Sequence, residues 1–128
     1  MKKLKNLPIS QITVLWLPVF LWASVIFFFS SLPQQTTSQV FIIDFVIKKI
    51  AHLSEYAILY ALLYRSTQKK LILSFILTII YAATDEIHQS FVPGRTAKLY
   101  DVVGFDLAGA SIAAFLLWKL KPPHPGKL

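Results

Sequence analysis

The chain has 128 residues, of which 55% are hydrophobic and only 15% are charged. Because an ordinary soluble domain carries about 25% charged residues, this chain has too little polar surface for the competing fold, a soluble helical bundle. The net charge of +7 is spread over short basic clusters between apolar blocks, which argues against a nucleic-acid-binding stripe, and the absence of cysteine excludes disulfides, thiolate metal ligands and cysteine catalysis.

Four apolar blocks follow one another along the chain and predict an all-α membrane protein with four transmembrane helices. The first block, Val14–Ser30, contains no charged residue, and a spanning helix needs about 17–25 mostly apolar residues. This block is longer than the apolar region of a signal peptide and lacks an A-x-A-like cleavage site after it, so we expect a retained helix. The other three blocks are Ile50–Tyr64, Leu71–Thr84 and Val102–Trp118.

The second and third blocks reach spanning length only if each helix continues into its polar flank. Extending the third block through Asp85–Gln89 gives about 20 residues from Lys70 and a length near 30 Å, with a polar motif on the last turns. The second helix is predicted to begin near Lys48 or Lys49. The preceding segment Phe41–Ile47 is either a short interfacial helix or, as we favour, a lead-in to that helix.

The basic residues predict the orientation of the bundle. With the N-terminus in the cytoplasm, nine of the thirteen Lys and Arg residues fall on the inner side and four on the outer side. An excess of basic residues in cytoplasmic loops sets topology, so residues 1–121 are predicted to form an N-in/C-in bundle and 122–128 a Pro-rich cytoplasmic tail. The same topology places all six acids in outer loops or outer helix halves: Asp44, Glu55, Asp85, Glu86, Asp101 and Asp106.

Two of the predicted helices carry a polar face with the same spacing. On each helix, three polar residues stand at i, i+3 and i+4 and therefore share a face: His52, Glu55 and Tyr56 on the second helix, and Asp85, His88 and Gln89 on the third. Glu86 is turned by about 100° from Asp85. A charged side chain at the bilayer centre costs about 2.5–3.5 kcal/mol, so such residues usually face the bundle interior and mark function.

Further polar residues lie at the end of the third predicted helix and at the start of the fourth, at the same depth in the membrane as the two polar faces. Pro93 cannot continue a helix and Gly94 permits a tight turn, so the third helix is predicted to end before them, with Arg95 at the outer surface. Asp101 opens the fourth helix at the positive end of its macrodipole, and Asp106 lies about one and a half turns deeper. Small residues near Asp106 permit close helix packing.

The segments His52–Tyr56 and Thr84–Arg95, together with Asp101 and Asp106-x-x-Gly109, resemble the VanZ-like family of bacterial integral membrane proteins. The resemblance covers most of the chain, and Asp-Glu-x-His-Gln…Pro-Gly-Arg is its most specific part. It implies a multi-pass protein of the bacterial cytoplasmic (plasma) membrane, related to the accessory factor that lowers sensitivity to teicoplanin. The family's last helix usually carries Asn or Asp about four residues after its first aspartate, whereas Asp106 stands five after Asp101.

Two enzymatic interpretations fit these polar residues, and in both the protein acts on an envelope lipid. In the first, a divalent metal such as zinc or manganese is bound with an open position for water, and its candidate ligands are His52, Glu55, Asp85 and His88. In the second, Glu55 or Asp85 is a general base without a metal, a histidine is its partner, and Arg95 clamps a lipid phosphate.

Two further interpretations need no reaction. The outer site recognises a membrane lipid or a lipid-linked cell-wall precursor without turnover, or the buried charges pair, Arg95 with Asp101 or Glu86, and only fix helix packing. Acids outnumber cations near the outer surface, so pairing cannot be complete, and we favour a functional site. Homo-oligomers remain an open alternative. The candidate catalytic residues are Glu55, Asp85, Glu86, His88 and His52, and the candidate binding residues are Arg95, Gln89, Tyr56, Asp101 and Asp106.

Overall fold

The computed structural model describes residues 8–33, 41–95 and 102–120, and no strand occurs among them. Its elements are α1 (Ile9–Ser31), α2 (Phe41–Ser66), α3 (Leu71–Gln89), the π-helical turn η2 (Val102–Asp106) and α5 (Leu107–Lys119). Because η2 leads directly into α5, the described residues form four helical rods.

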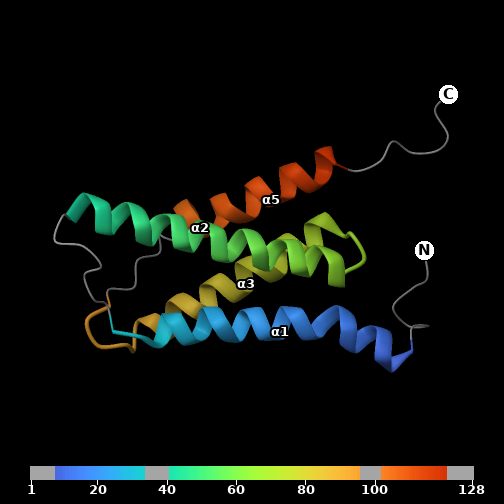
Figure 1. Ribbon diagram of the computed structural model, residues 1–128, viewed down its shortest axis with the longest axis horizontal. Helices are drawn as coiled ribbons and strands as arrows, with labels where there is room; N and C mark the ends of the chain where they lie inside the picture. Colours follow the sequence, from blue (N-terminus) through green and yellow to red (C-terminus); the bar gives the residue numbers. More distant parts are fainter. Residues whose placement is uncertain (1–7, 34–40, 96–101, 121–128) are drawn as a thin grey trace.

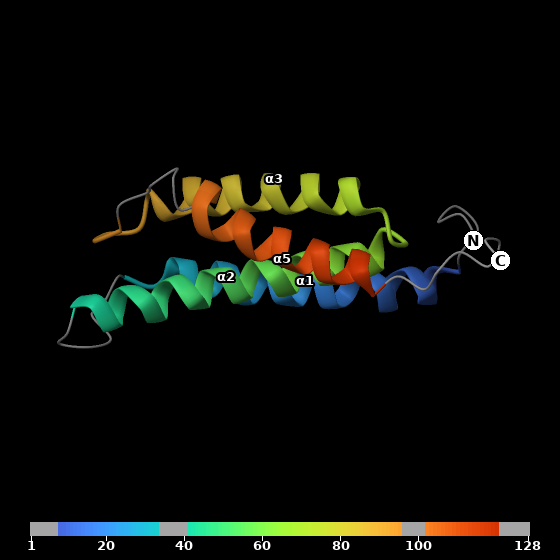
Figure 2. The same cartoon turned by 90° about the horizontal axis from the view of Figure 1, so that it is seen from above.

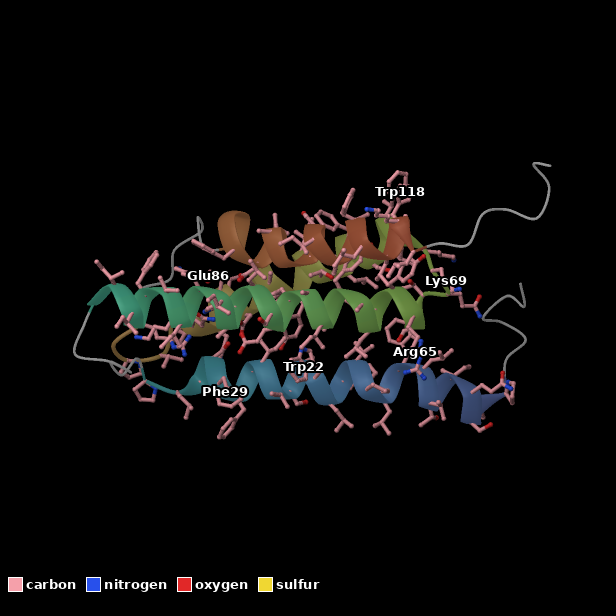
Figure 3. All side chains as sticks on the ribbon, turned by 45° about the horizontal axis from the view of Figure 1, so that its top comes forward. Trp22, Phe29, Arg65, Lys69, Glu86 and Trp118 are labelled. Atoms are coloured by element: carbon pink, nitrogen blue, oxygen red, sulfur yellow. The ribbon has the colours of Figure 1, made fainter. Side chains whose placement is uncertain are left out.

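Consecutive rods run in opposite directions, and α2 lies between α1 and α5 with contacts to every other rod (Figure 1). The view from above places α3 across from α1 and α2 (Figure 2). The end of α1, the start of α2, the end of α3 and η2 all lie at one end, which we call the polar end. At the opposite end stand Arg65, Lys69 and Trp118, whereas Glu86 and Phe29 lie toward the polar end (Figure 3).

The third rod has the length predicted for it. α3 spans 19 residues and includes the whole Asp85–Gln89 motif, so the polar motif occupies the last turns of an otherwise apolar helix. The chain then turns through Pro93 to Gly94, whose φ of +79° lies in the left-handed region that glycine adopts without steric cost.

The second rod starts earlier than predicted. α2 is one continuous helix of 26 residues from Phe41, so Phe41–Ile47 leads into the helix and is not a separate interfacial helix, and a start at Lys48 or Lys49 is wrong. No proline or glycine interrupts the segment, and extending an existing helix costs much less than nucleating one. In Figure 1 the first turns of α2 project past the end of α1.

The fourth rod has nearly the predicted bounds, but it opens with a π-helical turn that the sequence did not predict. Hydrogen bonds in a π-helix run from residue i to i+5, so this turn takes in one residue more than an α-helical turn. Asp106 stands five positions after Asp101, which equals the i to i+5 interval of such a turn. Asp101 itself lies outside the described residues.

Two of the rods, α1 and α3, are long and apolar enough to cross a membrane. α1 is apolar on all sides, yet only 11% of its most apolar window is buried within the bundle. Phe20 is 65% exposed and Phe28 is 61% exposed. A helix that is hydrophobic all round needs an apolar environment on its free faces, and lipid supplies one.

A seam of tyrosines on α2 forms much of the core. Tyr56, Tyr60 and Tyr64 are buried, and the rings of Tyr60 and Tyr64 stack with centroids 6.3 Å apart. These three tyrosines stand four residues apart on one face of α2, and that face is a packing seam. Polar cross-links supplement it: Trp22 Nε1 of α1 donates to the backbone oxygen of Glu55 at 2.9 Å.

α2 and α5 approach most closely at Gly109. A Cβ at this position would overlap the carbonyl oxygen of Leu53 and lie 3.0 Å from its carbonyl carbon, so only glycine fits without movement of the backbone. Small residues allow helices in membranes to approach in this way. The contact holds α5 against the stretch of α2 that carries His52 and Glu55.

Replacement of Gly109 by alanine is expected to destabilise the fold by about 1–3 kcal/mol, because the new methyl group must push α5 away from α2. Thermal unfolding of the detergent-solubilised protein, followed by circular dichroism, measures this loss. Gly104→Ala is the matched control, since a Cβ at Gly104 meets nothing within 4 Å. Equal melting temperatures for the two variants would contradict the close approach at Gly109.

Candidate functional site

Asp85 is a buried carboxylate, 3% exposed, at which three helices meet. Its Oδ2 accepts hydrogen bonds from Ser30 Oγ of α1 at 2.8 Å, from the Tyr56 hydroxyl of α2 at 3.1 Å, and from Gln89 Nε2 of α3 at 2.9 Å. Gln89 Nε2 also lies 3.2 Å from Ser30 Oγ. Hydrogen bonds to a carboxylate are strong in low-dielectric surroundings, so this network ties α1, α2 and α3 together.

The other carboxylate oxygen of Asp85 is unusual. Oδ1 is inaccessible to solvent and has no hydrogen-bond partner among the residues that the structure describes. A buried polar atom without a partner costs free energy, and native proteins contain few of them. Asp85 thus combines one fully used acceptor atom with one buried acceptor atom that has no donor among the described residues.

His52 and Asp106 form a second polar cluster, between α2 and η2. His52 Nδ1 lies 3.2 Å from Asp106 Oδ1, and the two side chains are 24% and 3% exposed. A carboxylate at Nδ1 fixes the orientation of an imidazole ring and directs Nε2 away from the carboxylate. Nε2 of His52 makes no hydrogen bond with any residue in the described ranges.

Glu55 lies between the two clusters. Its side chain is half-buried, one turn along α2 from His52, and it is within electrostatic reach of His52, Asp85, Asp106 and Arg95. Within the described part of the chain, its carboxylate makes no hydrogen bond or ion pair. Glu55 is thus an acid held in the site without an internal partner.

His88 connects the end of α3 to the end of α1. Its Nε2 lies 2.9 Å from Ser31 Oγ, and its ring stacks on Phe27 with centroids 4.1 Å apart. The histidine therefore contacts α1, although the i, i+3 spacing from Asp85 suggested a role beside that carboxylate. Glu86, its neighbour in the motif, is buried on α3.

Arg95 caps the last turn of α1. Its Nε donates to the carbonyl oxygen of Leu32 at 3.0 Å and its Nη2 to that of Phe29 at 2.8 Å. Carbonyl groups at a helix C-terminus carry partial negative charge, and α1 has no basic residue in its own last turn. This contact was not predicted, and it leaves fewer guanidinium donors for the lipid phosphate that Arg95 was expected to clamp.

The structure sorts the candidate residues into connected groups. Tyr56 and Gln89 join Asp85, Asp106 joins His52, Glu55 stands between them, and Asp101 lies outside the described residues. Sequence reasoning missed Ser30 and Ser31, the two hydroxyls that reach α3. The available signal was their position, because both end an apolar block at the level where the third helix becomes polar.

The metal hypothesis finds no support in this geometry. Among the described His, Asp and Glu residues, no group of three or more is placed to hold a metal ion. His52 and His88, which would supply nitrogen ligands, instead contact Asp106 and Ser31. The arrangement can accept hydrogen bonds, bind a cation and exchange protons.

An apolar groove of about 390 Å³ lies away from these clusters, toward the opposite end. It runs between α2, α3 and α5 and carries no charged side chain. Its lining consists of Tyr60, Leu71, Ile72, Phe75, Ile76, Ala114, Phe115 and Trp118. Such a surface fits an acyl chain and offers no group for chemistry, so the polar end remains the candidate site.

Asp85→Ala is expected to lower the free energy of unfolding by about 1–3 kcal/mol for each buried donor that loses its acceptor. Asp85→Asn retains an acceptor oxygen and should lose less. Denaturant titration in detergent micelles compares these variants with Thr84→Ala, an exposed neighbour whose hydroxyl bonds only to the Tyr81 carbonyl of its own helix. If Asp85→Ala were as stable as Thr84→Ala, the carboxylate would not be the junction described above.

Comparison with known proteins agrees with the resemblance noted in the sequence. The family model described as VanZ/LLP1 matches residues 15–121, well over half of the chain, and this range contains both polar clusters. No curated protein and no solved structure matches the chain. The family match, taken together with the two apolar helices α1 and α3, indicates a membrane protein. The chain belongs to the VanZ/LLP1 family.

Proposed function

We propose that this protein crosses the bacterial plasma membrane four times with both termini inside, and that its polar end faces outward and binds an envelope lipid or a lipid-linked cell-wall precursor. The antiparallel order of the rods supports four crossings. The orientation rests on charge, because Arg65, Lys69 and Lys70 stand at the end opposite to the described acids.

The observation that carries the binding role is the carboxylate of Glu55, which stands between two ordered polar clusters without a partner among the described residues. If the acids served only to fix helix packing, each would be expected to have an internal partner, because an unpaired acid in an apolar bundle costs free energy. Glu55 and Asp85 Oδ1 lack such partners within the described ranges. Acceptors of this kind suit a ligand that brings its own hydrogen-bond donors.

Binding without turnover also fits the role implied by the family. Teicoplanin-type lipoglycopeptides act on lipid-linked precursors at the outer face of the membrane. A protein that holds such a precursor, or a lipid around it, changes how the precursor is presented and so lowers sensitivity to the antibiotic. The ordered clusters around Glu55 supply a fixed frame for recognition, since their own side chains are held by hydrogen bonds.

Acid–base catalysis on the same lipid is the second candidate, and the His52–Asp106 pair favours it. A carboxylate at Nδ1 orients the ring and stabilises its protonated form, which leaves Nε2 placed to take a proton from a bound hydroxyl or water. This candidate needs no metal. It differs from simple binding in that the lipid composition of expressing cells would change.

The topology is tested with single cysteines, because the chain contains none of its own. Ser90→Cys near the polar end and Lys70→Cys near the opposite end are both at exposed positions. In intact cells, a membrane-impermeant maleimide should label Ser90→Cys and should reach Lys70→Cys only after permeabilisation. Labelling of Lys70→Cys in intact cells would overturn the N-in/C-in orientation.

Expression of the protein in a teicoplanin-sensitive host is expected to raise the inhibitory concentration, and Glu55→Gln should abolish this protection because it removes the unpaired negative charge. Ser54→Ala is the matched control, since Ser54 is exposed and its hydroxyl bonds to the Ile50 carbonyl of its own helix. Susceptibility is compared at equal membrane levels. Protection by Glu55→Gln equal to that of the wild type would exclude the unpaired acid as the basis of the effect.

A further inference from the structure

The groups left open at the polar end share one chemical character, since all of them accept hydrogen bonds. They are the Glu55 carboxylate, Asp85 Oδ1 and, when the ring is neutral, Nε2 of His52. Asp85 Oδ1 is a second acceptor without a described donor at this end, in a residue that is 3% exposed and holds three donors on its other oxygen.

The cations beside these acceptors are engaged elsewhere. Arg95 directs Nε and Nη2 to the carbonyl groups that end α1. Lys49 places its amine over the rings of Phe45 and Phe105, at 5.5 and 4.6 Å from their centroids. In the described part of the chain no cation forms an ion pair with Glu55, although His52 and Arg95 lie within electrostatic reach of its carboxylate.

A carboxylate such as that of Glu55, placed in an apolar bundle, selects among lipid headgroups by charge. It repels a phosphate or a carboxylate, because like charges interact strongly where the dielectric constant is low. It attracts a primary ammonium, which brings one positive charge and three donors in a compact group. Glu55 and His52 are partly exposed, so a headgroup can reach them.

We infer that the polar end binds the primary ammonium group of an envelope lipid, with the partly exposed Glu55 carboxylate as its partner. This inference rests on the proposed lipid-binding function and adds the chemical class of the ligand. Primary ammonium groups occur on aminophospholipid headgroups and on the peptide of lipid-linked cell-wall precursors, and both present the same chemistry to the site.

The test measures lipid retention by the purified full-length protein with native mass spectrometry. The probes are dioleoyl phosphatidylethanolamine, its N-acetylated form and dioleoyl phosphatidylglycerol, which share their acyl chains. The wild type should prefer the free amine over its N-acetylated form by about tenfold or more, as expected for hydrogen bonds between charged groups. Glu55→Gln should lose this preference and Ser54→Ala should keep it.

Folding does not confound this comparison, because Glu55 has no partner to lose among the described residues, and Glu55→Gln should melt at the wild-type temperature or above it. A lipid-linked precursor with a free peptide amine, tested beside its acetylated form, distinguishes the two sources of the ammonium group. Equal retention of all lipids by the wild type would overturn the ammonium assignment while lipid binding stands. Retention of no envelope lipid would overturn the proposed function as well.

Discussion

The carboxylate of Asp85 sits in an apolar bundle and collects one donor from each of α1, α2 and α3 on a single oxygen atom. Burying a charge in such surroundings is costly, so the three helices are held in the one arrangement that offsets this cost with hydrogen bonds. The register between α1 and α3 follows from it. Once Ser30 is fixed on Asp85, Ser31 meets His88, and Arg95 reaches the carbonyl groups at the end of α1.

A second constraint, the contact of Gly109 with Leu53, sets the distance between α2 and α5 and so places Asp106 beside His52. α2 takes part in both constraints, because Tyr56 reaches Asp85 and His52 reaches Asp106. Glu55 lies between them on the same helix, and it is the acid that neither constraint uses. Rigid clusters on both sides of a carboxylate that has no partner among the described residues form a preorganised acceptor, which suits the proposed recognition of a donor-bearing lipid headgroup.

Spacing within one helix could be read from the sequence, whereas contacts between helices could not. The extension of α3 through Gln89 was predictable because the polar motif continues the helical spacing until Pro93-Gly94 stops it. The start of α2 was not, since Phe41–Ile47 is apolar enough either to lie at an interface or to continue into the helix. Likewise, the face shared by Asp85 and His88 was visible, but the partners of these residues on α1 depend on the register of two helices. Local propensity also gives no sign of the π-helical turn, which differs from an α-helical turn by one residue.

A double-mutant cycle on Ser30 and Asp85 tests the junction most directly, with the free energy of unfolding measured in detergent micelles. Ser30→Ala should destabilise the wild-type protein and should cost much less in an Asp85→Ala background, because the acceptor of its hydroxyl is already gone and only its contact with Gln89 remains. The coupling energy should fall within about 0.5–3 kcal/mol, the range found for residues in one hydrogen-bond network. If Ser30→Ala cost the same in both backgrounds, the two side chains would be independent, and Asp85 would not be the group that holds α1 against α3.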